Sequence, residues 1–170
     1  MKLFQTSEVG ARGPADGVAG GVSRGVADGA AREATHGPTS GLRLLLVDDC
    51  RINRMLVAAV LARWGIVHTI ACNGEQAVRI TQRQGFDLVL MDVLMPVMDG
   101  IVATARIRQA EREDPQRMPM PIIAYTSLDL GTHPERLARV GLSAVLAKPC
   151  SATTLGQCLA QWCGSKFAGP

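Results

Sequence analysis

An almost wholly apolar run ends abruptly in a carboxylate near the middle of this chain. Residues 88–91 read Leu-Val-Leu-Met, Asp92 follows directly, and the chain then turns through Pro96 and Asp99-Gly100 into a helical pattern. A strand that is apolar on both faces is typical of a parallel sheet buried between two helix layers. Ligands bind at the carboxyl ends of such strands, so Asp92 is placed for chemistry. The alternative is that Asp92 only caps the following turn.

Four other short apolar runs have the form of buried strands, and turn residues or helical patterns separate them. Three of the four end in polar side chains, as the central run does. The predicted strands cover residues 42–47, 66–71, 88–91, 121–127 and 144–147. The predicted helices run from Asn53 through Trp64, from Gly74 to Gly85, from Gly100 to roughly Glu111, from His133 to Gly141 and from Ala152 to Trp162.

Five strands alternating with five helices predict a doubly wound parallel α/β sandwich, with right-handed crossovers. We expect the strand order 2-1-3-4-5, because that order gathers the polar strand ends around one crevice. Each signal is weak alone: Asp48-Asp49 could be a solvated turn and helix cap, and Thr126 an ordinary hydrogen-bonding residue at a strand end. Their convergence is the stronger evidence. The crevice would contain Asp48, Asp49, Asp92, Thr126 and Lys148.

The first 40 residues differ from the rest of the chain in composition. They are dominated by Gly, Ala, Ser, Thr and isolated charges. With so few large apolar groups, the segment cannot offset an ordering cost of about 1–2 kcal/mol per residue. We therefore predict a disordered Gly/Ala-rich arm over residues 1–40, a folded domain over 41–163 and a tail over 164–170.

Charge and cysteine content exclude several classes of protein. The formal net charge is only +3, and basic residues are not clustered as a nucleic-acid surface requires. The five cysteines form no Cys-x-x-Cys pair, and an odd count without a secretory segment suggests reduced thiols in a cytosol. No run approaches the roughly 18 apolar residues of a membrane span. We expect a cytoplasmic protein that binds neither nucleic acid nor membrane.

Three carboxylates with a hydroxyl and an ammonium suit phosphoryl transfer. No Ser/His/Asp or Cys/His set accompanies them, which argues against a protease. A hard cation such as Mg²⁺ takes carboxylate oxygens and keeps waters for phosphate oxygens. A central carboxylate, Asp92, can act as the nucleophile and accept the phosphoryl group covalently. Lys148 would then pair with the new dianion, and Thr126 would donate a hydrogen bond to it.

The same residues resemble a known family, the receiver domain of two-component response regulators. Residues 91–100, Met-Asp-Val-Leu-Met-Pro-Val-Met-Asp-Gly, closely resemble the phosphorylation-site motif of receivers attached to hybrid histidine kinases. Residues 46–49 followed by Asn53-Arg54 are similar to the opening of that subgroup. With Thr126-Ser127 and Lys148-Pro149, the resemblance covers about residues 42–163. It implies a flavodoxin-like (βα)5 fold.

The resemblance also implies the roles of individual residues. Asp92 would take a phosphoryl group from a phosphohistidine, so the partner would be a histidine kinase or a histidine phosphotransfer protein. Asp49 and Asp92 would coordinate Mg²⁺ directly, together with the main-chain carbonyl of Leu94, while Asp48 would act through bound water. A cis bond is implied between Lys148 and Pro149. We expect a monomer that catalyses its own phosphoryl transfer and is otherwise a signalling protein, a receiver standing alone or with an arm.

One departure from the family, one expectation about hydrolysis and two alternative functions accompany this interpretation. The family often carries Tyr or Phe where this chain has Val145, and Tyr125 lies on another strand. Leu94 and Leu128 would border the attacking water without orienting it, so we expect slow hydrolysis. The alternative is that both leucines point away and the lifetime is ordinary. A haloacid-dehalogenase-type phosphatase is rejected because it needs Asp where Leu94 stands. The remaining alternative is a docking module of receiver fold in which phosphorylation is secondary.

Overall fold

The computed structural model describes residues 2–4, 41–114, 116–127 and 138–167. Most of the predicted arm therefore lies outside the described residues, as does Leu128. The helix predicted over residues 133–141 falls largely outside them too. Its predicted last residue, Gly141, is described and has a φ of 93°, a conformation that favours glycine.

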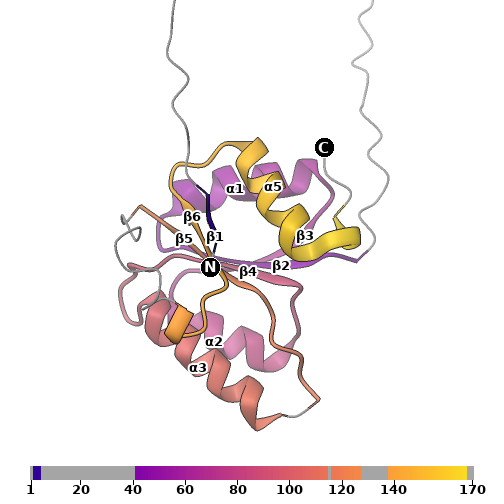
Figure 1. Ribbon diagram of the computed structural model, residues 1–170. Coiled ribbons are helices and arrows are strands. Elements are labelled where there is room, and N and C mark those ends of the chain that lie inside the picture. The colour runs from indigo at the N-terminus through magenta and orange to yellow at the C-terminus, as the bar shows by residue number, and fades with distance from the viewer. Residues whose placement is uncertain (1, 5–40, 115, 128–137, 168–170) are drawn as a thin grey trace, which may run out of the picture.

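A parallel six-stranded sheet forms the centre of the domain (Figure 1). Its order is β1-β6-β5-β4-β2-β3, and every neighbouring pair is parallel. The five strands from β2 to β6 confirm the predicted order 2-1-3-4-5. The strands are β1 Lys2–Phe4, β2 Arg43–Val47, β3 Val67–Ala71, β4 Leu88–Met91, β5 Ile122–Thr126 and β6 Ala144–Ala147.

The sixth strand, β1, lies within the segment that composition predicts to be a disordered arm. It places Lys2 opposite Ala144 and Phe4 opposite Leu146 in parallel register with β6. An edge strand presents unpaired backbone N–H and C=O groups, and any segment that can extend can pair with them. Composition therefore could not exclude this pairing, and Lys2–Phe4 is a correction to the predicted arm of residues 1–40.

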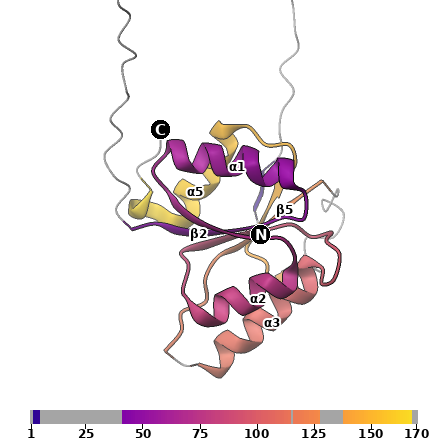
Figure 2. The same cartoon turned by 180° about the vertical axis from the view of Figure 1, so that it is seen from behind.

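Helices cover both faces of the sheet (Figures 1 and 2). The helices α1 and α5 lie on one face, and α2 and α3 on the other. In the described part of the chain, none is long and apolar enough to cross a membrane. Their bounds are α1 Arg51–Arg63, α2 Gly74–Arg83, α3 Gly100–Glu113 and α5 Ala152–Cys163, and a 3-10 turn, η2, covers Gly164–Lys166.

Alternation along the strands divides the core into two layers. On β2, Leu44 and Leu46 pack toward α1 and α5, whereas Leu45 and Val47 pack in the other cluster, which contains residues of α2 and α3. All four side chains are fully buried. Burial on both faces is the cause of the continuous apolar runs in the sequence.

The start of α1 differs from the prediction. The helix begins at Arg51 after an N-cap at Cys50, two residues before the predicted start at Asn53. Cys50 makes no side-chain cap hydrogen bond, whereas its backbone N–H donates to the Asp48 carboxylate at 2.8 Å. The Asp48 carboxylate thus satisfies the backbone N–H of the N-cap residue, and a search for Ser, Thr, Asp or Asn at the N-cap does not find this start.

The packed domain extends past the predicted boundary at residue 163. Phe167 is buried, and its ring lies 5.5 Å from that of Trp64 at the end of α1. Two aromatic rings bury enough apolar area to hold a short segment in place. Residues 164–167, which were assigned to the tail, are therefore part of the folded unit.

Candidate functional site

The polar strand ends are held in place by the sheet itself. The Asp92 N–H donates to the carbonyl of Val47 at 2.9 Å, so the pairing of β4 with β2 continues one residue past the strand. In the same way, the Lys148 N–H donates to the carbonyl of Thr126 at 2.9 Å. The backbone positions of the acid and the base at this edge therefore follow from strand register.

Three carboxylates gather at this edge, on loops that follow β2 and β4. Asp48, Asp49 and Asp92 each offer one oxygen atom, and these atoms lie within 4.8 Å of one another. Asp48 and Asp92 are buried, with 0% and 7% of their surface exposed, while Asp49 is open to solvent. Hard oxygen ligands that converge from one open side suit a divalent cation such as Mg²⁺.

A single ammonium group offsets part of this negative charge. Lys148 Nζ lies 2.5 Å from Asp48 Oδ2 and 2.5 Å from Asp92 Oδ2. The three side chains are nearly buried, with 9%, 0% and 10% exposed. Carboxylates this close repel one another unless a cation lies between them. Lys148 is that cation, and the cluster still carries more negative than positive charge.

The carboxylate of Asp48 accepts hydrogen bonds from the start of α1. Asp48 accepts the Cys50 N–H, and the Asn53 amide donates to the same oxygen at 3.4 Å. Arg54 donates to the backbone carbonyls of Asp48 and Asp49 at 2.7 and 2.8 Å. The Asp48 carboxylate and the backbone of both aspartates are therefore tied to the start of α1, while the Asp49 side chain is exposed. The observed contacts do not fit a freely solvated turn.

Gly100 allows the start of α3 to lie directly against Asp92. A Cβ atom at Gly100 would come within 2.0 Å of the Asp92 carbonyl oxygen, a distance that no side chain tolerates. The Gly100 N–H donates to the Val93 carbonyl at 2.9 Å. Sequence reasoning used Gly100 only as a turn signal and missed this contact with the central acid.

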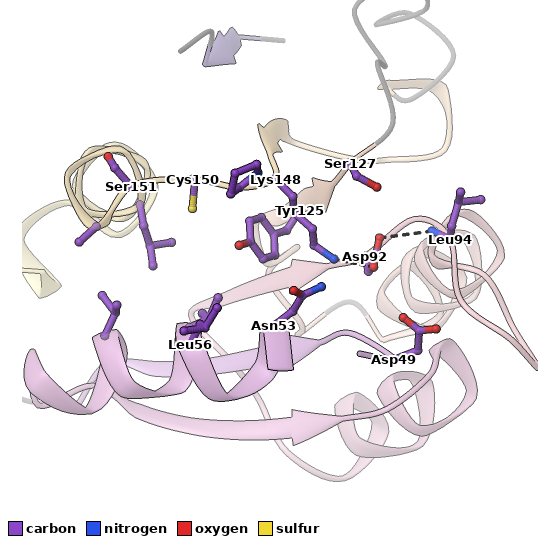
Figure 3. A pocket seen from close by; sticks show the side chains of 15 residues that line it. Asp49, Asn53, Leu56, Asp92, Leu94, Tyr125, Ser127, Lys148, Cys150 and Ser151 are labelled. Atoms are coloured by element: carbon purple, nitrogen blue, oxygen red, sulfur yellow. Dashed lines mark hydrogen bonds and ion pairs between the residues drawn. The ribbon is translucent and has the colours of Figure 1, made fainter. Parts of the chain in front are cut away.

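A cavity of about 510 Å³ opens from the carboxylates and runs between α1 and the start of α5 (Figure 3). Leu94 borders it and is 58% exposed. Thr126 is buried at the end of β5, between two residues that line the cavity. The lining consists of Asp49, Asn53, Leu56, Val57, Val60, Asp92, Leu94, Tyr125, Ser127, Lys148, Pro149, Cys150, Ser151, Ala152 and Leu155.

Tyr125 is a site residue whose role the sequence did not reveal. Its ring lies beneath Lys148 Nζ, 4.9 Å from ring centroid to nitrogen, on the α1 and α5 side of the sheet. Burial raises the pKa of Tyr125, as do the neighbouring thiol of Cys150 and the two buried aspartates. Burial also raises the pKa of Cys150, so this thiol is protonated at neutral pH.

The peptide bond between Lys148 and Pro149 is cis, as the resemblance implied. Fold and site together define a doubly wound α/β domain with an acidic crevice and a buried lysine at the carboxyl edge of its sheet. The family model of the response regulator receiver domain matches residues 44–160, which is more than half of the chain. The chain belongs to this family.

Curated relatives include sensor proteins much longer than this chain. It is 38% identical over 128 residues to the sensor protein GacS of Pseudomonas syringae pv. syringae, which covers 75% of the chain and 14% of the relative. It is 33% identical over 128 residues to the sensor histidine kinase RcsC of Salmonella typhimurium, covering 75% of the chain and 13% of the relative. The chain thus spans only about a seventh of the length of these two relatives.

Solved receiver structures have the same fold. The receiver domain of the sensor histidine kinase PA1611 of Pseudomonas aeruginosa, with a magnesium ion in its active-site cleft, is 35% identical. That match has a TM-score of 0.63 and covers 74% of this chain and 99% of the other. The Saccharomyces cerevisiae Ssk1 receiver, crystallised with the histidine phosphotransfer protein Ypd1, matches with a TM-score of 0.66 and 28% identity, covering 71% of this chain and 88% of the other.

Proposed function

We propose that this receiver domain takes a phosphoryl group from a phosphohistidine onto Asp92, with Mg²⁺ bound by the neighbouring carboxylates. The observation that carries the proposal is the position of the Lys148 ammonium, 2.5 Å from both Asp48 and Asp92. A buried lysine between two acids is a ready counter-charge for a phosphoryl dianion. The domain then signals with the phosphoryl group or relays it.

The chemistry assigns one task to each residue. An oxygen of Asp92 forms the new bond to phosphorus while the phosphorus–nitrogen bond of the phosphohistidine breaks and the imidazole leaves. Lys148 pairs with the transferred dianion, and the Thr126 hydroxyl donates a hydrogen bond to it. The domain thereby catalyses its own phosphorylation by positioning and charge neutralisation. Loss of the group to water is slow because Leu94 cannot orient a water molecule.

The donor set fits Mg²⁺. Two carboxylates, Asp49 and Asp92, together with the main-chain carbonyl of Leu94, would bind the ion directly, and Asp48 would act through a bound water. The oxygens of the three acids lie close enough for one ion, and the open side at Asp49 leaves room for water or phosphate. When bound, the ion neutralises charge on the phosphoryl oxygens.

Three exposed apolar side chains on α1 support a protein partner. Ile52, Met55 and Leu56 are 68%, 60% and 64% exposed, and Leu56 also lines the cavity that leads to Asp92. Exposed apolar groups beside a reactive site are typical of docking surfaces. We propose a histidine kinase or a histidine phosphotransfer protein as the partner, and a monomeric receiver. The five free thiols support a cytoplasmic location.

The first test is labelling with a small phosphodonor. The chain is incubated with acetyl phosphate and Mg²⁺, and its intact mass is measured. The wild type should gain one phosphoryl group and Asp92→Asn none, because, of the three carboxylates, Asp92 both lines the cavity and is paired with Lys148. Asp114→Asn, on the exposed end of α3, is the matched control and should label like the wild type. Equal labelling of Asp92→Asn contradicts the assignment.

The alternative is a docking module in which phosphorylation is secondary, and the exposed α1 side chains favour it equally. The two functions predict different behaviour of one variant. If Asp92→Asn binds the partner and supports signalling as well as the wild type, docking is the main function. If it binds the partner but no longer signals, the phosphoryl group carries the signal.

A further inference from the structure

The aromatic ring beneath Lys148 is a partner of a second kind for the ammonium group. Lys148 Nζ lies over the Tyr125 ring, 4.9 Å from its centroid, and also contacts Asp48 and Asp92. The face of an aromatic ring carries negative charge and attracts cations. Figure 3 shows the ring of Tyr125 on one side of the Lys148 side chain and Asp92 on the other. The ammonium is therefore held by two carboxylates and one ring.

Strand register explains why the Tyr125 ring reaches the lysine. Tyr125 on β5 lies opposite Leu146 on β6. Side chains alternate along a strand, so Lys148, which follows the last residue of β6, points to the same side of the sheet as Leu146. Tyr125 and Leu146 belong to the cluster on the α1 and α5 side, whereas Val145 belongs to the opposite cluster. A ring at position 145 would lie on the wrong face of the sheet for this contact.

We propose that Tyr125 is a positioning residue for Lys148, whose ammonium it holds between Asp48 and Asp92 in the geometry that receives a phosphoryl group. This inference rests on the proposed function of the site. A lysine side chain has four rotatable bonds and loses considerable freedom when fixed. The ring restricts that freedom from the side that the carboxylates leave open.

The hydroxyl of Tyr125 connects the same ring to the loop that carries the lysine. The thiol of Cys150, two residues after Lys148, lies near this hydroxyl and raises the pKa of Tyr125. Cys150 is half-buried beside the cavity and packs against the α1 and α5 cluster. The Tyr125 ring and the loop at Cys150 therefore both lie beside Lys148, and the ring face contacts the ammonium directly.

The inference predicts a ranked effect of two substitutions. Tyr125→Leu removes the ring and keeps an apolar side chain, so the rate of labelling by acetyl phosphate should fall about 3- to 30-fold, the range expected for a partly desolvated cation–π contact. Tyr125→Phe keeps the ring face and loses only the hydroxyl, so it should retain most of the wild-type rate. Thermal unfolding of both variants is measured to separate this effect from loss of folded protein.

A double-mutant cycle tests whether Tyr125 acts through Lys148. The readout is Mg²⁺ affinity, measured by NMR titration of backbone amides, because the ammonium competes with the ion for the carboxylates. Tyr125→Leu should tighten Mg²⁺ binding about 3- to 10-fold when Lys148 is present, since the loosened ammonium competes less. In a Lys148→Met background the same substitution should change Mg²⁺ affinity by less than about 1.5-fold.

The outcomes separate this inference from the proposed function. A wild type that binds Mg²⁺ but takes no phosphoryl group would refute phosphoacceptance, while the cycle would still decide the role of Tyr125. Equal effects of Tyr125→Leu in both backgrounds would show that the ring is only part of the core and would overturn the inference. A wild type without Mg²⁺ affinity would overturn it as well, because Lys148 would then have no competitor at the carboxylates.

Discussion

Two lysine–aspartate pairings lie at opposite ends of the strands and differ in almost every physical respect. At the carboxyl ends, Lys148 contacts Asp48 and Asp92, and all three side chains are nearly buried. At the amino end of β4, Lys166 contacts Asp87 at 2.7 Å, with 61% and 20% of the two side chains exposed. The first pairing leaves surplus negative charge inside the protein. The second is balanced and open to water.

The comparison shows that burial and charge balance, more than contact distance, distinguish a site from a structural contact. Both pairings have short contacts, so a list of ion pairs would treat them alike. Desolvated charges are costly unless each is compensated, and surplus carboxylates persist where a ligand supplies the missing charge. The Asp48–Lys148–Asp92 cluster is buried and has surplus negative charge, which are properties of a binding site. The Asp87–Lys166 pair is a balanced surface ion pair.

Removal of Lys148 should have the largest effect on stability. Lys148→Ala leaves the carboxylates of Asp48 and Asp92 facing each other without a cation, which costs roughly 3–5 kcal/mol when a buried pair is broken. Mg²⁺ should restore much of that loss, because it binds only the folded cluster. The measurement is urea unfolding with and without Mg²⁺. If Mg²⁺ does not reduce the loss of stability, the ion cannot replace the ammonium. The Lys148 cluster would then not differ from the Lys166 pair as a cation-binding site.

Much of this site could be predicted because the strands are apolar on both faces and end in polar residues. Asp92, Asp48 and Lys148 were identified by their positions after buried runs, and parallel strands bring such ends together. The ion pairs themselves could not be predicted, because Lys148 and Asp48 are 100 residues apart and their contact depends on side-chain conformation. The contact of Tyr125 with Lys148 depends on both register and face.

Three other features were missed for different physical reasons. The pairing of Lys2–Phe4 with β6 uses backbone groups, which composition does not report. The packing of Phe167 on Trp64 joins two residues far apart in the chain. The close approach at Gly100 depends on where α3 begins relative to the Asp92 carbonyl. Each depends on tertiary geometry that local patterns do not encode.

A glycine at each end of the sheet gives the next prediction. Gly100→Ala forces a Cβ atom against the Asp92 carbonyl, so the start of α3 must shift, at a cost of about 1–3 kcal/mol. The shift should also slow labelling at Asp92. Gly85→Ala, near the amino end of β4, meets no atom within 4 Å and is the matched control. It should be neutral or stabilising by up to about 1 kcal/mol.

Thermal unfolding and labelling rates of the two glycine variants are compared in parallel. Equal destabilisation would mean that the carboxyl ends of the strands are no more tightly packed than the amino ends. That result would remove the structural basis for treating Gly100 as part of the site.

A smaller effect is expected at Leu94, which borders the cavity beside Asp92 and is largely exposed. A polar side chain there can hydrogen-bond the water that attacks the phosphoryl group, and one such bond is worth about 0.5–1.5 kcal/mol. Leu94→Asn should therefore shorten the lifetime of the phosphorylated protein roughly 2- to 10-fold. Leu94→Met stays apolar and should decay like the wild type. If both variants decay at the wild-type rate, Leu94 does not control access of water.

The smallest effect is expected at the opposite pairing. Burial by itself would raise the pKa of Asp87, but hydrogen bonds from Lys166 and the Arg43 N–H and the nearby positive charges lower it overall. The hydrogen bond and charge of Asp87 raise the pKa of Lys166. The stabilisation that the Asp87–Lys166 pair gives to the folded state is therefore present at neutral pH. It is lost as the pH falls from 3.8 through the lower folded pKa of Asp87, and as it rises above 10.5 through the folded pKa of Lys166.

Lys166→Ala tests this pairing by the pH dependence of thermal unfolding. At pH 7 the variant should unfold at a slightly lower temperature than the wild type, because exposed ion pairs contribute little. The difference should shrink as the pH falls below 3.8, where Asp87 becomes protonated in both proteins. Labelling by acetyl phosphate at pH 7 should be unchanged, since Lys166 lies at the other end of the strands from Asp92. If Lys166→Ala lost as much stability as Lys148→Ala, the two pairings would contribute equally to the free energy of unfolding. Burial would then not determine how much an ion pair contributes.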